Sequence, residues 1–202
     1  MKVIFHKISN IYPNSIKGLR TSIELGHKKF ELDIRKCRDT FILYHDAIKN
    51  DGYVSQQNLL ELGEIDTLKN FIHETNKYSG LEIYFDLKGT DITIVDFFKT
   101  NKNLLNFKNK YFFQSFNIEI IQKLKAAEPK FHCGFIVSGY RPISSNILNS
   151  MDYICIEEEF IGKYVQYDIN KYLWTVNSDK KKDYYTNIGI TGIFTDFPKK
   201  FI

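Results

Sequence analysis

Two acidic residues, Glu31 and Asp33, lie two positions apart in the apolar segment Phe30–Ile34. Side chains alternate between the two faces of a strand, so both carboxylates project from the same face. Placing them on a face that is normally apolar costs on the order of several kcal/mol unless a positive charge neutralises them. The spacing therefore predicts a cation beside Glu31 and Asp33.

Other residues suited to acid, base or metal chemistry follow neighbouring apolar runs. His6 follows the first run, His45 ends a short run after the second strand, and Asp86 and Lys88 close the third strand. Three carboxylates form an all-oxygen ligand set, which suits Mg²⁺ or Ca²⁺. Two histidines, with a reference pKa of about 6.5, could serve as general acid and base. Together with a lysine, these groups indicate a site for a phosphodiester.

Short apolar runs alternate with segments of helical periodicity along the chain. The predicted strands are Lys2–Phe5, Phe30–Ile34, Glu82–Asp86, Tyr111–Gln114, His132–Val137, Tyr153–Ile156, Tyr172–Val176 and Gly192–Thr195. The predicted helices are Ser15–Leu25, Ile65–Tyr78, Ile92–Thr100, Ile118–Ala127, Ser144–Ser150, Ile161–Tyr167 and Lys180–Asn187. Phe41–Tyr44 is interpreted as an excursion that returns at His45. This alternation predicts an α/β fold, and eight repeats favour a small (β/α)₈ TIM barrel over an open sheet.

In such a barrel the catalytic groups lie at the C-terminal ends of the strands. The polar candidates fall at or just beyond these ends, and they include Gln114 after the fourth strand, Trp174 late in the seventh and Asp196 after the eighth. We therefore expect them to gather at one rim of the barrel.

Length and composition indicate one ordinary globular domain. The chain has 202 residues, 43% of them hydrophobic and 26% charged, so we expect a single domain over residues 1–202. No apolar run approaches the roughly 20 residues of a membrane span, and no signal-peptide core follows Met1. These features predict a cytoplasmic protein with no transmembrane segment.

Cysteine and lysine usage suggests no further chemistry. Cys37, Cys133 and Cys155 are widely spaced and odd in number, which favours reduced thiols over disulfides or zinc. The formal net charge of +4 comes from scattered lysines, and the run 180–182 is interpreted as a solvated face rather than a nucleic-acid site. We expect no nucleic-acid partner, and the sequence leaves the oligomeric state open.

The order of these motifs resembles the glycerophosphodiester phosphodiesterase family. The matching pieces are His6, Glu31-x-Asp33, His45-Asp46, Asp86-Leu87-Lys88, Gln114-Ser115-Phe116, Trp174-Thr175-Val176-Asn177 and Gly192–Pro198. They run from residue 6 to residue 198, essentially the whole chain. The resemblance implies a phospholipase-C-like TIM barrel that hydrolyses glycerophosphodiesters to glycerol 3-phosphate and an alcohol with the help of a divalent cation.

The resemblance also implies a role for each matching residue. The acid–base pair would be His6 and His45, and the metal ligands would be Glu31, Asp33 and Asp86. The substrate-binding residues would be Lys7, Lys88 and Trp174. Lys7 stands where the family has the arginine of its H-R-G motif, so a bidentate fork on phosphate becomes a point charge.

Departures from the family pattern leave two alternative functions open. The usual E-N-T reads Pro13-Asn14-Ser15, and Asp86 stands where the family commonly has Glu, in a stretch similar to sphingomyelinase D. That similarity favours a phospholipase-D-like activity on lysophospholipid or sphingophospholipid as an alternative. The altered H-R-G and E-N-T stretches raise a second alternative, a non-catalytic phosphate-binding barrel.

Overall fold

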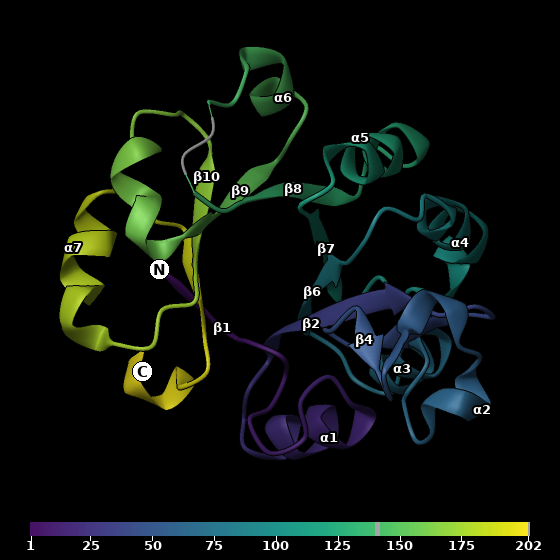
Figure 1. Ribbon diagram of the computed structural model, residues 1–202. Helices are drawn as coiled ribbons and strands as arrows, with labels where there is room; N and C mark the ends of the chain where they lie inside the picture. The colour runs from purple at the N-terminus through teal and green to yellow at the C-terminus, as the bar shows by residue number, and fades with distance from the viewer. Residues whose placement is uncertain (140–141, 202) are drawn as a thin grey trace.

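A ring of parallel strands forms the centre of the computed structural model, which describes residues 1–139 and 142–201. In spatial order the strands are β1 (Lys2–Phe5), β2 (Lys29–Lys36), β6 (Glu82–Leu87), β7 (Lys110–Ser115), β8 (His132–Val137), β9 (Tyr153–Glu157), β10 (Asn170–Trp174) and β11 (Gly192–Thr195). Strand β1 pairs with both β11 and β2, which closes the ring. Helices lie outside the strands (Figure 1). The predicted (β/α)₈ barrel is confirmed.

The helices connect successive strands on the outside of the barrel. They are α1 (Ile16–Glu24), α3 (Leu68–Thr75), α4 (Thr93–Asn101), α5 (Ile118–Ala127), α6 (Ser145–Asn149) and α7 (Lys182–Asn187). Side-chain caps fix where several of them begin: the oxygens of Ser15 and Asn117 accept hydrogen bonds from the backbone N–H groups of Gly18 and Glu119. The connection from β7 to α5 is the shortest of these, since β7 ends at Ser115 and α5 begins at Ile118.

One connection is longer than the others and carries His45. Strand β3 (Phe41–Leu43) runs antiparallel to β2, and the backbone N–H of Tyr44 donates to the Asp33 carbonyl. A hairpin of β4 (Ile48–Lys49) and β5 (Gly52–Tyr53), a 3₁₀ turn and the short helix α2 (Leu59–Leu62) follow before α3. The excursion therefore returns the chain to the C-terminal end of β2, as the sequence predicted.

Large aromatic side chains fill the barrel interior. The interior cluster comprises Ile4, Tyr84, Phe112, Ile136, Tyr153, Cys155, Tyr172 and Phe194. The rings of Tyr84 and Phe112 stack at a centroid distance of 4.2 Å. Tyr153 lies so close over Gly134 that a Cβ there would come within 2.2 Å of its ring, which explains a glycine in the middle of β8. A larger cluster and two smaller ones make up the rest of the core of the described residues.

Beyond shifts at the ends of elements, three differences from the predicted elements stand out. The seventh strand is Asn170–Trp174 rather than Tyr172–Val176, because the residues that pair with β9 begin at Asn170. The helix predicted over Ile161–Tyr167 is wrong: a 3₁₀ helix covers Glu158–Lys163, and Gly162 in that segment disfavours an α-helix. Helix α3 spans only Leu68–Thr75, since the residues before it return from the excursion. None of these differences moves a candidate site residue off its strand end.

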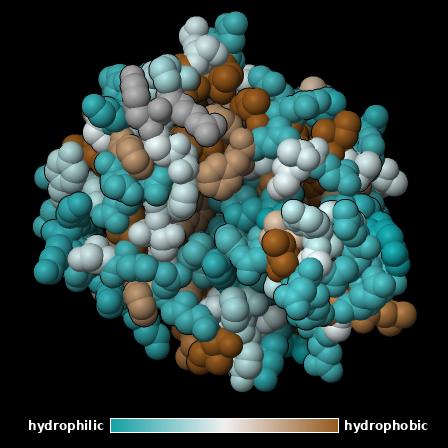
Figure 2. Space-filling view, in the orientation of Figure 1, coloured by the Kyte–Doolittle hydropathy of each residue, from teal (hydrophilic) through white to brown (hydrophobic). Residues whose placement is uncertain are grey.

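The surface in Figure 2 is mostly hydrophilic, with separate apolar patches. Over the described ranges, no helix combines the length and apolar character needed to cross a bilayer. The three cysteines are buried and free, in agreement with the prediction of reduced thiols.

Candidate active site

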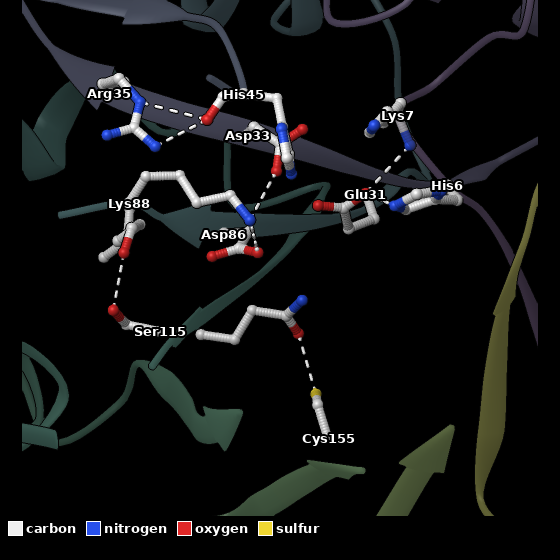
Figure 3. A network of polar contacts seen from close by, with 12 residues as sticks. His6, Lys7, Glu31, Asp33, Arg35, His45, Asp86, Lys88, Ser115 and Cys155 are labelled. Atoms are coloured by element: carbon white, nitrogen blue, oxygen red, sulfur yellow. Dashed lines mark hydrogen bonds and ion pairs between the residues drawn. The ribbon is translucent and has the colours of Figure 1, made fainter. Parts of the chain in front are cut away.

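Three carboxylates converge at the C-terminal ends of β2 and β6. Glu31, Asp33 and Asp86 are all buried, and one oxygen of each lies within 4.8 Å of an oxygen of the other two. Asp33 pairs with Asp86 across the two parallel strands, so their side chains share a face. Figure 3 shows the three groups directed toward one point.

Lys88 is the cation that lies among these acids. Its Nζ is 3.0 Å from Asp33 Oδ1 and 2.6 Å from Asp86 Oδ2. Asn14 makes two further bonds to Asp33: its amide donates to Oδ2 at 2.8 Å, and its carbonyl accepts from the backbone N–H at 3.0 Å. Burial favours the neutral acid, but Lys88 and Asn14 outweigh it and lower the pKa of Asp33. Asp33 is therefore ionised at neutral pH.

The other two carboxylates are less well compensated. Burial, reinforced by the charge of Asp33, raises the pKa of Glu31 to about 8. Burial likewise raises the pKa of Asp86 to about 6, although Lys88 opposes the shift. In addition, Asp86 Oδ1 is buried without a hydrogen-bond partner among the described residues. Three acids facing one lysine, with an oxygen left unpaired, fit a divalent cation with oxygen ligands.

His6 reaches the carboxylates from the end of β1. Its Nδ1 lies 2.8 Å from Asp196 Oδ1, and its Nε2 lies 3.8 Å from Glu31 Oε2. Burial opposes a charged ring, but the hydrogen bond to Asp196 and the charge of Glu31 outweigh it and raise the pKa of His6. An acceptor on Nδ1 places a proton there and directs Nε2 toward the cavity. Asn177 in turn donates to Asp196 Oδ2 at 2.7 Å, which holds that carboxylate in position.

His45 approaches the same cavity from the excursion. Its Nδ1 lies 2.7 Å from Asp46 Oδ1. The guanidinium of Arg35 donates to the His45 carbonyl from Nε at 3.2 Å and from the terminal nitrogen at 2.6 Å. The backbone is therefore fixed although the imidazole is half-exposed. Each histidine thus has a carboxylate partner on one nitrogen and its other nitrogen available.

A cavity of about 230 Å³ connects these groups. One side is polar and includes both histidines, Glu31, Asp86 and Lys88. The apolar residues of its lining, which we call the apolar wall, are Phe116, Ile136, Trp174 and Phe194. The indole Nε1 of Trp174 is buried without a partner in the described ranges. The cavity can therefore hold a molecule that has a charged end and a less polar end.

The structure brings together seven of the eight predicted site residues around this cavity and its carboxylates, and it places Lys7 differently. The backbone N–H of Lys7 donates to Glu31 Oε2 at 2.9 Å, whereas its side chain does not line the cavity. It lies near Asp46 and Asp196 and contributes to lowering the pKa of both. Lys7 thus contacts the site chiefly through its backbone.

Sequence reasoning missed the roles of several polar neighbours. Asn14, Arg35 and Asp196 each hold a candidate site residue by a hydrogen bond. The closed barrel offered a signal for Asp196, because the last strand must pair with the first and its end must then face His6. Asn14 also had a signal, because it retains the asparagine of the family's E-N-T motif, whereas the bond from Arg35 to the His45 carbonyl depends on the path of the excursion.

Replacing Glu31 by glutamine should change how the metal-free protein responds to pH. Folding raises the pKa of Glu31 from 4.5 to about 8, so the folded chain holds a proton that the unfolded chain has lost in this range. The free energy of unfolding therefore falls as pH rises from about 4.5 to about 8. Glu31→Gln removes this contribution, which is on the order of a few kcal/mol.

Urea unfolding in a chelator at pH 6 and pH 9 measures this effect. We expect wild type to lose more stability than Glu31→Gln between the two conditions. Glu82→Gln is the matched control, because Glu82 begins the neighbouring strand and pairs with Lys2 at 2.7 Å at the other end of the barrel. Identical pH responses of wild type and Glu31→Gln would show that folding does not raise the pKa of Glu31.

Comparison with known proteins reveals relatives along the whole chain. The family model described as "Glycerophosphoryl diester phosphodiesterase family" matches residues 8–200. YhdW of Bacillus subtilis (strain 168), whose name assigns it provisionally to the glycerophosphodiester phosphodiesterases, is 23% identical over 233 residues, covering 98% of this chain and 95% of the relative.

Two solved structures share the fold at low sequence identity. A glycerophosphodiester phosphodiesterase from Parabacteroides distasonis superposes with a TM-score of 0.86 at 19% identity, covering 99% of this chain and 94% of the other. A phosphodiesterase from Oleispira antarctica in complex with the product sn-glycerol-3-phosphate also has a TM-score of 0.86, at 20% identity, covering 100% and 95%. These likenesses support the barrel assignment independently of the strand pairing.

Proposed function

The chain belongs to the glycerophosphoryl diester phosphodiesterase family and is an enzyme of that class, and from this premise we propose that the cavity binds a glycerophosphodiester and hydrolyses it to glycerol 3-phosphate and an alcohol. The observation that carries this proposal is the convergence of three carboxylates, a lysine and two histidines on one cavity of about 230 Å³. This reaction needs a metal site with oxygen ligands and two side chains that can carry protons, and the cavity brings such groups together.

Glu31, Asp33 and Asp86 would hold the divalent cation. Three carboxylate oxygens within 4.8 Å of one another and an unpaired Asp86 oxygen suit a hard ion such as Mg²⁺ or Ca²⁺. When bound, the ion supplies positive charge for the phosphoryl oxygens and a substrate anchor. Asn14 and Lys7 keep Asp33 and Glu31 in place through their hydrogen bonds.

His6 and His45 would move the protons. The P–O bond to the alcohol breaks as the attacking oxygen bonds to phosphorus, so one proton must leave the attacking oxygen and one must reach the alcohol oxygen. Asp196 raises the pKa of His6, which favours His6 as the acid that protonates the leaving alcohol. His45, more exposed and fixed by Arg35 and Asp46, would accept the proton from the attacking oxygen.

Lys88 and Trp174 would bind the substrate on either side of the reacting phosphate. Lys88 is mostly buried and lies beside Asp86, where its ammonium can reach a phosphoryl oxygen. Trp174 packs edge-on against Phe116, with the two ring centroids 5.7 Å apart. Its ring would face the alcohol or the glycerol portion of the substrate. Lys7 would add positive potential at the rim rather than a direct contact.

The apolar wall favours one second candidate, cleavage of lysophospholipids or sphingophospholipids. Phe116 is partly exposed at the mouth and continues the wall outward, where an acyl chain could lie. Preference for substrates with an acyl chain over water-soluble diesters would support this candidate. A non-catalytic phosphate-binding barrel has less support, because both histidines line the cavity and all three carboxylates proposed for the metal are present as one cluster.

Hydrolysis of glycerophosphocholine tests the proposal directly. We expect release of choline and glycerol 3-phosphate in Mg²⁺ or Ca²⁺, and loss of turnover when excess chelator is added. The two products are quantified separately, so that cleavage on either side of phosphorus is distinguished. Equal rates with and without chelator, or no release of glycerol 3-phosphate from this diester under any metal, would overturn it.

A further inference from the structure

Gln114 lines the same cavity as the polar groups and the apolar wall. It is the penultimate residue of strand β7, where its Cα pairs with that of Asp86 on β6. The residue is 3% exposed, and its side chain lines the cavity together with Asp86 and Ile136. A polar amide so deeply buried is costly unless both its ends have partners.

A buried thiol occupies one end of this amide. Cys155 Sγ donates to Gln114 Oε1 at 3.1 Å, a bond drawn in Figure 3. Cys155 is fully buried in the barrel interior, and burial raises its pKa well above the usual range. It therefore remains a thiol and keeps its proton for this bond. The thiol fixes which way the amide points, because the carbonyl oxygen faces the barrel interior.

The other end of the amide has no protein partner. No hydrogen bond joins Gln114 Nε2 to any residue in the described parts of the chain. Nor is Nε2 among the enclosed unpartnered atoms, which are Asp86 Oδ1, Tyr111 Oη and Trp174 Nε1. Its N–H groups therefore open onto the cavity. An amide held in this way can only donate, so it selects a ligand oxygen that accepts a hydrogen bond.

We propose that Gln114, oriented by Cys155, is a specificity-determining residue that donates a hydrogen bond to a hydroxyl oxygen of the substrate's glycerol. This inference rests on the proposed function. The metal ligands and histidines lie on or next to β1, β2 and β6 and on the excursion. Gln114 lies on β7, the next strand in the barrel after β6, and lines the cavity together with the apolar wall. In this proposal the glycerol half of the substrate lies on that side of the phosphate, and the leaving alcohol lies on the other.

The proposal predicts a change in substrate selectivity rather than a general loss of activity. Gln114→Met keeps the length of the side chain and removes the donor. Its kcat/KM for glycerophosphocholine should fall by about tenfold, chiefly through KM, which corresponds to one lost hydrogen bond. For bis(p-nitrophenyl) phosphate, which has no hydroxyl, the fall should be at least several times smaller. The ratio of the two kcat/KM values is therefore the measured quantity.

Variants of Cys155 test the orienting bond. Cys155→Ala frees the carbonyl and should move the selectivity ratio in the same direction as Gln114→Met. Cys155→Ser retains a hydroxyl donor and should restore most of the ratio. Cys133→Ala is the matched control, because Cys133 is equally buried on the adjacent strand but packs in the cluster between strands and helices. It should lower stability without changing the ratio.

The outcomes separate this inference from the proposed function. If wild type hydrolyses neither diester, the proposed function fails first. If wild type hydrolyses both but Gln114→Met loses the same factor on each, Gln114 does not recognise the hydroxyl and the inference is overturned. A ratio that Cys155→Ala and Cys133→Ala change equally would overturn the role of the thiol, since a packing defect would then explain both.

Discussion

His45→Ala should lower kcat for glycerophosphocholine by about 10²- to 10⁴-fold, the range expected for loss of a general acid or base. The structure gives the reason: His45 faces the cavity with one nitrogen held by Asp46, and its backbone is fixed by Arg35. The substitution removes an imidazole that is half-exposed, so we expect the fold and the metal affinity to change little. The loss should therefore appear in the rate and not in the stability.

Steady-state kinetics of His45→Ala, His6→Ala and the double variant measure this effect. His6 and His45 act on the two ends of one displacement, so the double variant should lose little more than the worse single variant. His73→Ala is the control, because His73 lies on the outer surface of α3, away from the cavity. A loss below tenfold in both single variants would show that the histidines are not the proton carriers.

The barrel could be predicted from the sequence because its signal is repeated. Eight apolar runs, each too short to identify a fold by itself, alternate with helical segments, and eight such repeats favour a closed barrel over an open sheet. The hairpin Ile48–Tyr53 and helix α2 could not be predicted in the same way. Their strands are two residues long and the helix spans four, so no periodicity develops.

The part of the site that lies at the ends of strands could be predicted from the sequence. Glu31, Asp33 and Asp86 share a face by the alternation of side chains and the register of β2 with β6. Contacts made across the barrel mouth escaped prediction, because they depend on loop paths and side-chain rotamers. Asn14 bonds to Asp33 from a loop residue with a positive φ of 49°, a conformation that the sequence did not reveal.

Asp86→Asn should weaken the affinity for the divalent cation by more than the roughly 10- to 100-fold typical of losing a group that only supports a ligand. The substitution keeps the shape of the side chain but removes one of three negative charges around the proposed metal position. Lys88 keeps its other partner, Asp33, at 3.0 Å, so the neighbouring charges stay paired. Burial already raises the pKa of Asp86 to about 6, so the neutral amide should not destabilise the metal-free fold.

Thermal unfolding with increasing Ca²⁺ or Mg²⁺ checks this result without relying on turnover. A ligand at 100 times its Kd stabilises a protein by about 2.7 kcal/mol, whereas the same concentration at a Kd raised 100-fold gives only about 0.4 kcal/mol. We therefore expect the stabilisation to disappear almost entirely in Asp86→Asn and to persist in Glu82→Gln, a carboxylate of the same strand that pairs with Lys2 instead. Equal metal-dependent stabilisation of the two variants would place the cation elsewhere, and the three buried acids would then need another explanation for their unpaired charge.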